Sequence, residues 1–360
     1  MQPVQVVEPT LEGYSGHCHA LVSSLCHALA GMPVELWSAK AAAGLAFGAH
    51  VTQHAMFSRR LRLVQAYFLY RRLLRAGAPV VVTTARRSDL VLLDHAAGGP
   101  IPGGRAFLYF HWLRESPAKL RALRALAKRQ PHLAILGTTA SVVDAFRRCG
   151  FANVRLLPYP PPPAGDDASP AAFAQLLYAG AARQDKGFPL VADLAALMAR
   201  EGDATPLAVQ VSADHYGKYD ARTRADIERL RASGHRALRL IEQSLQPQEY
   251  AGLFRGSICL QPYDREAFRD RVSGVTLDAL THACPVVATA GTWSAELVDR
   301  HGAGVALEDL SAGGLLAAVR EVQRDYAGFQ QRARLAGEAL NRESWHPLLD
   351  QLPATPVRRG

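Results

Sequence analysis

The chain has 360 residues, of which 49% are hydrophobic and 20% are charged. A chain of this length usually forms more than one hydrophobic core, and the composition excludes a disordered protein. We therefore expect two globular domains. Five scattered cysteines without a CxxC pair favour a reduced cytoplasmic compartment over a disulfide framework. We expect no signal peptide, because the N-terminus lacks a basic region followed by an apolar core, and no apolar run long enough to span a bilayer.

The positive charge is concentrated in the first half of the chain. Residues 1–165 contain 19 Lys and Arg against 7 Asp and Glu, and the remainder contains 22 against 25, which together give the net charge of +9. A basic surface attracts anionic lipids, nucleic acid or phosphorylated substrates. Because no zinc finger, basic zipper or aromatic RNA-binding motif accompanies it, we expect no nucleic-acid partner.

The N-terminus has a Rossmann-type beginning, with an apolar strand at residues 4–7, a glycine loop at residues 12–17 and an apolar helical run. Two interpretations of His17 stay open: a side chain that faces a ligand, or an ordinary loop histidine. A metal site of His17, Cys18 and His19 ranks third, because adjacent side chains diverge and no further ligands complete the shell.

Residues 56–75 mix arginines with large apolar side chains at helical intervals, which predicts a helix. In one interpretation its apolar stripe packs on the domain and the arginines lie in water. In the other, the helix lies on an anionic membrane, with its arginine stems and aromatic rings in the interface.

Buried strands are predicted at residues 79–83, 90–93, 106–112, 132–136 and 154–157. The third of them delivers His111 at its C-terminal end, where open α/β sheets bind ligands. A structural histidine is the alternative for this position. Thr139 is predicted to cap a helix, and the proline run at residues 158–163 predicts a stiff extended linker.

The alternation of strands and helices restarts after the linker. A strand at residues 176–179 leads to a loop with Arg183, Lys186 and Gly187. Two cations in a glycine-bounded loop at the C-terminal end of a strand suit the neutralisation of a diphosphate. A solvated basic loop is the plainer alternative.

The most informative stretch is residues 262–298. Asp270 and Asp278 flank the glycine turn Ser273-Gly274-Val275, which opens a helix before a valine-rich strand at residues 286–288. The free N–H groups and the dipole of a helix start favour an anion, and two carboxylates can accept hydrogen bonds from sugar hydroxyls. The stretch therefore predicts binding of a phosphorylated sugar, and an ordinary βαβ turn with two solvated acids is the alternative.

This stretch resembles the donor-binding signature of retaining GT-B glycosyltransferases of family 4. In that family, two acids at this spacing precede a helix, a small residue, a proline and a valine-rich strand. Both acids are Asp here where Glu is usual, and His282-Ala283-Cys284-Pro285 stands in place of an Ala-x-Gly-x-Pro pattern. Lys186-Gly187 and His111 match further positions of the family, whereas Arg183 lies closer to the lysine than is usual.

The resemblance implies an α/β protein with the GT-B fold, in which two Rossmann-like domains with parallel sheets face an interdomain cleft. We expect the first, acceptor-side domain at residues 1–160, a linker at residues 161–170 and the nucleotide-sugar domain at residues 171–340. Residues 341–360 would form a C-terminal helix that crosses back to the first domain, with Trp345 as a packing residue.

The resemblance also implies an activity, the transfer of a hexosyl or pentosyl group from a nucleotide-diphosphate sugar to a hydroxyl acceptor. The configuration of the sugar would be retained, no metal or other cofactor would be needed, and the product would be a surface polysaccharide or glycolipid. Arg183, Lys186 and the amides of Ser273, Gly274 and Val275 would stabilise the leaving diphosphate.

The remaining site residues follow from the same resemblance. His111 and Asp270 would hold the donor sugar, and Asp278 would hold the ribose of the nucleotide. In the first domain, Gly16 and His17 belong to a loop that approaches the donor and the acceptor.

The expected partners are a nucleotide sugar, a hydroxyl acceptor of a family whose acceptors are often lipid-linked, and an anionic membrane surface at residues 56–75. The expected location is cytoplasmic, with peripheral attachment to the inner face of the membrane. Two other classes of function stay open: a nucleotide-sugar epimerase of the same architecture, and a non-catalytic module that binds a phosphorylated ligand or a membrane.

Overall fold

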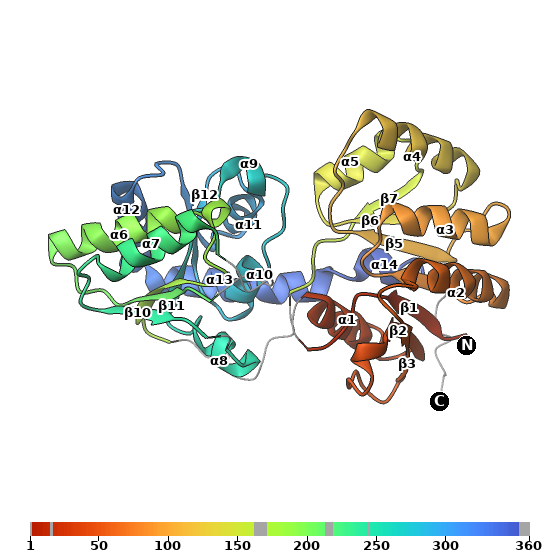
Figure 1. Ribbon diagram of the computed structural model, residues 1–360, viewed down its shortest axis with the longest axis horizontal. Coiled ribbons are helices and arrows are strands. Elements are labelled where there is room, and N and C mark those ends of the chain that lie inside the picture. The colour runs from red at the N-terminus through yellow and green to blue at the C-terminus, as the bar shows by residue number, and fades with distance from the viewer. Residues whose placement is uncertain (1, 15–16, 162–170, 213–218, 244, 353–360) are drawn as a thin grey trace. The chain divides into compact units, whose positions relative to one another are not determined.

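Figure 1 shows a computed structural model of the protein, which describes residues 2–14, 17–161, 171–212, 219–243 and 245–352. The chain forms two compact units: unit 1 comprises residues 1–162 and 342–360, and unit 2 comprises residues 163–341. Each unit is built on one parallel sheet with helices on both faces. The predicted α/β architecture is therefore confirmed.

The sheet of unit 1 has seven parallel strands within the described residues, in the order β3-β2-β1-β4-β5-β6-β7. The order reverses between β1 and β4, which is the switch point where open sheets of this kind bind ligands. The strands are β1 (Val4–Glu8), β2 (Val34–Ala39), β3 (Val51–Phe57), β4 (Val80–Val82), β5 (Ala106–Phe110), β6 (Ala134–Gly137) and β7 (Asn153–Leu156).

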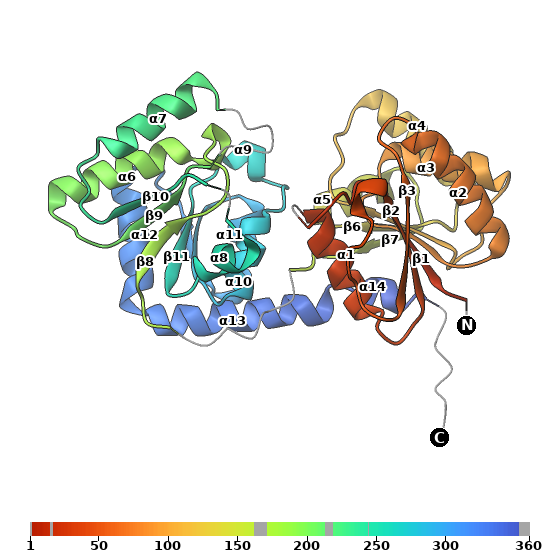
Figure 2. The same ribbon diagram turned by 60° about the horizontal axis from the view of Figure 1, so that its bottom comes forward.

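Two helical layers cover this sheet, because successive strand residues point to opposite faces. Val6 contributes to the core under α1 (His17–Ala28) and α14 (His346–Leu349). Val7 contributes to the opposite core, which is covered by α2 (Arg62–Ala76), α3 (Arg87–Ala97), α4 (Pro117–Arg129) and α5 (Ala140–Arg148). In Figure 2, α2, α3 and α4 lie together on the side of this sheet away from α14. The short 3-10 helix η1 (Lys40–Ala42) follows β2.

The sheet of unit 2 has six parallel strands within the described residues, in the order β10-β9-β8-β11-β12-β13. Its order reverses between β8 and β11. The strands are β8 (Gln175–Tyr178), β9 (Leu207–Gln210), β10 (Leu238–Ile241), β11 (Ser257–Gln261), β12 (Val286–Thr289) and β13 (Gly304–Leu307).

The helices of unit 2 also form two layers. One core lies under α6 (Phe188–Glu201), α7 (Ala221–Arg231) and α12 (Ala312–Arg324). The other lies under α8 (Pro247–Gly252), α10 (Gly274–Thr281) and α11 (Trp293–His301). The short elements η2 (Gln184–Lys186) and α9 (Arg265–Phe268) lie in the loops after β8 and β11, and α13 (Tyr326–Glu343) continues the chain into unit 1.

The strand predicted at residues 90–93 is wrong, because these residues lie inside α3. Leu90 and Leu93 face the core at helical spacing, and the Asp89 carboxylate accepts a hydrogen bond from the Arg86 N–H (2.8 Å) at the start of the helix. An apolar run of this length fits either period, so the sequence does not separate them.

The helix predicted at residues 56–75 begins later than expected. Met56 and Phe57 end β3, and α2 starts at Arg62. The Gln65 side chain closes the intervening turn, since it accepts a hydrogen bond from the Ser58 N–H (2.9 Å) and donates one to the Met56 carbonyl (3.0 Å). Phe57 is consequently buried in the core and does not belong to the surface of the helix.

The packing role predicted for Trp345 is confirmed. Its side chain is buried, and its indole Nε1 donates a hydrogen bond to the Ser24 hydroxyl (2.9 Å). The indole also lies 6.0 Å from the Tyr109 ring, centroid to centroid. The chain after α13 is thus part of the core of unit 1.

Candidate functional site

Two loops of unit 2 are held together at the carboxyl edge of its sheet: residues 179–187 after β8, and residues 262–273 after β11. The Asp264 N–H donates a hydrogen bond to the Asp185 carbonyl (3.0 Å). Gly187 has a φ of +68°, and a Cβ at this position would lie 1.7 Å from the Pro262 carbonyl oxygen. Only glycine allows this close approach, which gives the Lys186-Gly187 pair a structural reason.

The amine of Lys186 lies against the backbone that follows β8. Its Nζ is 2.9 Å from the position that a Cβ would take on Gly180, and the Val275 Cγ2 is 3.3 Å from the same position. The Tyr263 ring centroid is 5.6 Å from the Nζ, within the range of a cation–π contact. The structure therefore brings the predicted lysine and the first turn of α10 together.

The surroundings of Lys186 disfavour its positive charge. Burial and the positive charges of Arg183 and Arg271 lower the pKa of this amine to about 8, while Asp185 opposes them. A site with excess positive charge gains free energy when an anion enters it. This is the electrostatic character that a diphosphate-binding group requires.

The start of α10 supplies backbone donors at the same place. Ser273 caps the helix, since its hydroxyl accepts a hydrogen bond from the Thr276 N–H (3.4 Å). The Thr276 hydroxyl donates to the Gln261 side chain (2.6 Å), which fixes the first turn to β11. The first N–H groups of a helix, here at Gly274 and Val275, point outward and carry partial positive charge. The predicted glycine turn that opens a helix is confirmed.

The two predicted acids have different surroundings. Asp278 is half-buried and accepts a hydrogen bond from the Tyr250 hydroxyl (3.1 Å). Burial raises the pKa of the Asp278 carboxyl to about 6, although the Tyr250 hydrogen bond and the charge of Lys186 oppose this rise. Asp270, in contrast, is exposed in the loop between α9 and α10. The charge of Lys186 therefore acts on the Asp278 carboxyl.

Arg271 is a site residue that the sequence analysis missed. Asp185 accepts a hydrogen bond from the Arg183 Nε (2.8 Å) and forms an ion pair with the Arg271 Nη1 (3.5 Å). One carboxylate thus holds two guanidinium groups beside the Lys186 amine. The signal in the sequence is the position of Arg271, directly after Asp270 in the loop that opens α10.

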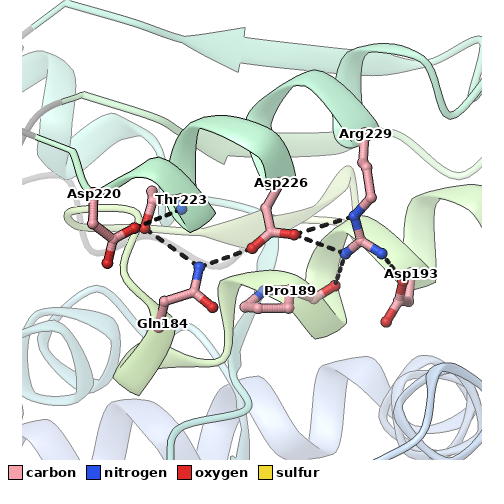
Figure 3. Close-up of polar contacts among 7 residues, drawn as sticks. All are labelled: Gln184, Pro189, Asp193, Asp220, Thr223, Asp226 and Arg229. Atoms are coloured by element: carbon pink, nitrogen blue, oxygen red, sulfur yellow. Dashed lines mark hydrogen bonds and ion pairs between the residues drawn. The ribbon is translucent and has the colours of Figure 1, made fainter.

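A polar network outside the predicted motifs supports the loop of Lys186 (Figure 3). The Gln184 amide donates a hydrogen bond to the Asp226 carboxylate on α7 (2.8 Å). Asp226 also pairs with Arg229 (3.0 Å), which reaches Asp193 on α6 (3.0 Å). Residues that orient a functional loop keep it rigid when they are themselves fixed. This network therefore ties the loop to two helices of the scaffold.

A buried carboxylate lies at the carboxyl edge of the sheet of unit 1, and it too was not predicted. Glu8 ends β1, is fully buried, and accepts hydrogen bonds from the Thr83 hydroxyl (2.8 Å) and the Thr10 N–H (3.0 Å). The Thr84 hydroxyl donates to the same carboxylate. The signal in the sequence is an acid at the end of an apolar strand.

His111 follows β5 directly, at the same edge, as predicted. Its Nε2 lies 2.9 Å from the Thr83 carbonyl, and its own carbonyl accepts a hydrogen bond from the Thr138 hydroxyl (2.7 Å). Because a carbonyl only accepts, the Nε2 carries the proton. The rings of Tyr109 and Tyr159 approach the imidazole edge to face, with centroid distances of 4.9 and 5.2 Å.

The predicted residues of the first loop are described only in part. Gly16 lies outside the described residues, and His17 is the first residue of α1. Burial and the charge of Glu8 raise the pKa of the neighbouring Cys18 thiol to about 11, so this side chain is protonated at neutral pH. Among the described residues, no group of three or more His, Cys, Asp or Glu side chains is placed to hold a metal. No described helix has the length and apolar character to span a membrane.

No protein-family model and no curated protein matches the sequence. Solved structures do match. A sucrose-phosphate synthase from Thermosynechococcus elongatus aligns over 98% of this chain and 97% of its own, with a TM-score of 0.67 and 15% identity. A UDP-forming trehalose-phosphate synthase from Burkholderia xenovorans aligns over 98% and 100%, with a TM-score of 0.61 and 13% identity. WaaG, a glycosyltransferase involved in lipopolysaccharide biosynthesis, aligns over 97% and 98%, with a TM-score of 0.59 and 14% identity.

These alignments cover nearly the full length of each partner, and they show that the protein has the GT-B fold. The predicted fold is confirmed. Family 4 is not singled out within it, since synthases of sugar phosphates and a lipopolysaccharide glycosyltransferase match about equally well.

Proposed function

We propose that the protein is a glycosyltransferase that moves a sugar from a nucleotide-diphosphate sugar to a hydroxyl acceptor. The observation that carries this proposal is the meeting of Lys186, the first turn of α10 and Asp278 at one edge of unit 2. The names of the structural neighbours support it, because all three are glycosyltransferases or synthases of a sugar phosphate.

The leaving diphosphate is the chemical problem that this site suits. As the bond between the anomeric carbon and the diphosphate oxygen breaks, the acceptor oxygen bonds to that carbon, and the hydroxyl proton ends on the departing diphosphate. Positive groups fixed in advance stabilise the charge that develops there. We assign this role to Arg183, Lys186 and the amides of Ser273, Gly274 and Val275, and we add Arg271 to the set.

The other site residues take the roles that the family resemblance implies. Asp278 would hold the ribose, and Asp270 would accept hydrogen bonds from the donor sugar. His111 would orient the sugar from unit 1, and Gly16 and His17 would line the approach of donor and acceptor. Retention of configuration belongs to the same proposal.

The biological setting belongs to the same proposal. The lipopolysaccharide role named for one neighbour and the basic first half of the chain favour synthesis of a surface polysaccharide or glycolipid at the membrane. All five cysteines are free thiols, which favours the cytoplasmic side. A reaction without a metal is proposed because Arg183, Lys186 and Arg271 together supply cations at the diphosphate.

Thermal unfolding with nucleotides tests the donor site. A bound ligand raises the unfolding temperature by mass action, so we expect one nucleoside diphosphate to stabilise the protein more than its monophosphate does. UDP is the first choice, since one neighbour is named as UDP-forming. Absence of stabilisation by UDP, GDP and ADP alike would reject the site.

Product analysis then separates the classes of function. A glycosyltransferase hydrolyses the stabilising nucleotide sugar slowly and transfers it when an acceptor is present, and both activities should disappear in Lys186→Ala and Asp270→Ala. An epimeric nucleotide sugar formed without acceptor would indicate an epimerase. Binding without any turnover across a panel of acceptors would favour the non-catalytic module.

A further inference from the structure

The side of α2 that faces away from the core carries a continuous stripe of side chains. The helix packs on the sheet through Ala66, Leu69, Tyr70 and Leu73. Residues spaced three and four apart lie on one face of a helix. On the outward face this spacing aligns Val64, Phe68, Arg71 and Arg75, which we call the α2 stripe.

The first half of the α2 stripe is apolar and exposed. Phe68 is 62% exposed and Val64 is 57% exposed, and Leu61, three residues before Val64, is 59% exposed. Of the nine large hydrophobic side chains exposed among the described residues, four lie between positions 61 and 68. Scattered exposed hydrophobics are ordinary, whereas a cluster of them marks an interaction surface.

The second half of the α2 stripe is cationic and borders two hollows. One, of about 410 Å³, lies between α2 and the end of α3 and is lined by Arg71, Arg75 and Arg105 together with residues 95–98 and 100–102. The other, of about 370 Å³, is lined by Phe68 and the three arginines Arg71, Arg72 and Arg75. Both hollows therefore share the arginines of the stripe.

Several other arginines of the protein pair with acids. Arg129, for example, forms an ion pair with Asp94 at 2.8 Å. Within the described part of the chain, no salt bridge to an acid is formed by Arg71, Arg75 or Arg105. Unpaired guanidinium groups beside a hollow are suited to bind phosphate.

The larger hollow is separate from the candidate site of unit 1. Ala78, which lines it, precedes β4, and Arg105 precedes β5. The hollow thus lies at the amino edge of the parallel sheet, opposite the carboxyl edge that carries Glu8 and His111. Its charges need an explanation other than donor binding.

Balance of helix dipoles is one such explanation, since cations are favoured near the C-terminal end of a helix. It fits Arg75, which lies in the last turn of α2. It does not account for Phe68 and Val64, which remain exposed on the same face. An explanation of the whole stripe must include both its apolar and its cationic half.

We infer that the α2 stripe docks on an anionic membrane surface. Phe68 and Val64 enter the interface, and Arg71, Arg75 and Arg105 contact lipid phosphates at the larger hollow. An anionic bilayer offers an apolar layer next to an array of phosphates, so it can bind both halves of the stripe. Nucleic acid would bind the arginines through its phosphates but would leave the apolar half exposed. This inference narrows the predicted membrane contact of residues 56–75 to one face of α2, and its test does not involve the proposed catalysis.

Co-sedimentation of the full chain with vesicles tests the cationic half. We expect binding to vesicles of phosphatidylcholine with phosphatidylglycerol, and little to phosphatidylcholine alone. Arg71→Gln/Arg75→Gln should weaken this binding roughly 30-fold, since each basic residue near an anionic surface contributes about fivefold. The control Arg121→Gln/Arg124→Gln removes the same charge from exposed positions on α4 and should change binding by no more than about twofold at physiological salt.

Phe68→Ser tests the apolar half without a change in charge. We expect about tenfold weaker binding, as for partial loss of one buried aromatic side chain, whereas Leu156→Ser, at another exposed apolar position of unit 1, should have no effect. Equal binding to both kinds of vesicle, equal losses in the two arginine pairs, or an unchanged Phe68→Ser would each overturn the inference.

Thermal unfolding without vesicles separates docking from helix stabilisation. If Arg71→Gln/Arg75→Gln lowers the unfolding temperature and leaves vesicle binding intact, the arginines serve the helix dipole and the inference is wrong. If that variant does not fold, Arg71→Lys/Arg75→Lys keeps the charges and should restore both folding and anion-dependent binding. Loss of anion-dependent binding in this lysine variant despite normal folding would contradict the inference.

Discussion

Among single residues, Lys186 has the chemistry that depends most on its surroundings. Burial and the nearby charges of Arg183 and Arg271 bring its pKa down to about 8, so the free protein loses this charge as the pH rises through that value. A diphosphate restores the balance of charge and favours the protonated amine. Nucleotide binding should therefore be coupled to proton uptake at alkaline pH.

We predict that the affinity for the preferred nucleoside diphosphate falls as the pH rises from about 7 to about 9. Lys186→Met should weaken binding at pH 7 by roughly 10-fold to 100-fold, the value of one hydrogen-bonded charge, and should flatten the pH profile. Calorimetric titration in two buffers of different ionisation enthalpy measures both effects. Lys128→Met, an exposed lysine of α4, is the control that should keep the wild-type profile.

The raised pKa of Asp278 predicts that the stability of the free protein also depends on pH. This pKa is raised in the folded state to about 6, so between its usual range and pH 6 the folded protein binds more protons than the unfolded chain. The contribution of Asp278 to stability is therefore greatest at acid pH and is lost as the pH rises through about 6. At neutral pH the folded protein buries the charged carboxylate, which lowers its stability. Removal of this charge should therefore raise the stability at neutral pH.

Denaturant unfolding of Asp278→Asn and of the wild type at about pH 5 and pH 7 measures this linkage. We expect the stability of the variant, relative to the wild type, to be more favourable at pH 7 than at pH 5. The comparison cancels all groups that the two proteins share. A relative stability that is the same at both pH values would show that the Asp278 carboxyl titrates normally.

Which site residues the sequence could predict depends on how far apart their partners lie. The glycine turn at Gly274 and the Lys186-Gly187 pair are local motifs, and the structure places both at one sheet edge. Arg271 was missed because its partner Asp185 lies 86 positions away, and such a pairing leaves no local pattern. Glu8 was missed for the same reason, since it is bound by threonines 75 and 76 positions away.

At the level of elements, the contact between the loops after β8 and β11 decides the shape of the site. Gly187 makes this contact possible, because any side chain would collide with the Pro262 carbonyl. Gly202, at the end of α6, has a nearly equal φ of +70° but has open space where a Cβ would be. A comparison of substitutions at the two glycines therefore separates the cost of backbone strain from the cost of a steric collision.

We predict that Gly202→Ala costs about 1 kcal/mol of unfolding free energy, which is the ordinary cost of a left-handed alanine. Gly187→Ala should cost more, about 3 kcal/mol or above, and should weaken diphosphate binding because the loops are forced apart. Denaturant unfolding and nucleotide titration of both variants measure this. Equal costs with unchanged nucleotide binding would show that the loop contact is not needed.

Helices and strands were predicted best where the spacing of the apolar residues fitted only one of the two structures. Strands β8 and β12 are short runs of buried apolar residues and were expected. Residues 90–93 are an equally apolar run, yet they form part of α3, because the capping contact of Asp89 favours the helix. Strands β2 and β3 were not predicted. The first six of the seven residues of β3 are only partly buried or exposed, because this strand lies at the edge of the sheet, so its hydrophobic pattern is weak.

For the whole molecule, the division of the candidate residues between two units matters most. Lys186, Arg183, Arg271, Asp278 and the start of α10 all belong to unit 2, and Glu8 and His111 belong to unit 1. Repetition of the βα alternation in the sequence predicted two sheets. The return of the chain to unit 1 after α13 was expected from the family resemblance alone. Contacts such as that of Trp345 with Ser24, 321 positions apart, leave no local pattern in the sequence from which this return could be derived.

This division predicts that nucleotide binding and sugar transfer can be lost separately. His111→Ala should leave the dissociation constant of the nucleoside diphosphate within about threefold of the wild type, because the groups assigned to the phosphates are in unit 2, a difference of less than 1 kcal/mol. It should lower transfer by about 100-fold or more, as expected for loss of a group that acts near the anomeric carbon. His132→Ala, an exposed histidine of unit 1, should change neither quantity.

Calorimetry for binding and initial rates for transfer give the two readouts on the same preparations. Lys186→Met, unlike His111→Ala, should weaken nucleotide binding as well as lower the rate of transfer. If His111→Ala weakens nucleotide binding as strongly as Lys186→Met while both variants stay folded, the phosphates are not held by unit 2 alone. The assignment of His111 to the sugar and of Lys186 to the diphosphate would then have to be abandoned.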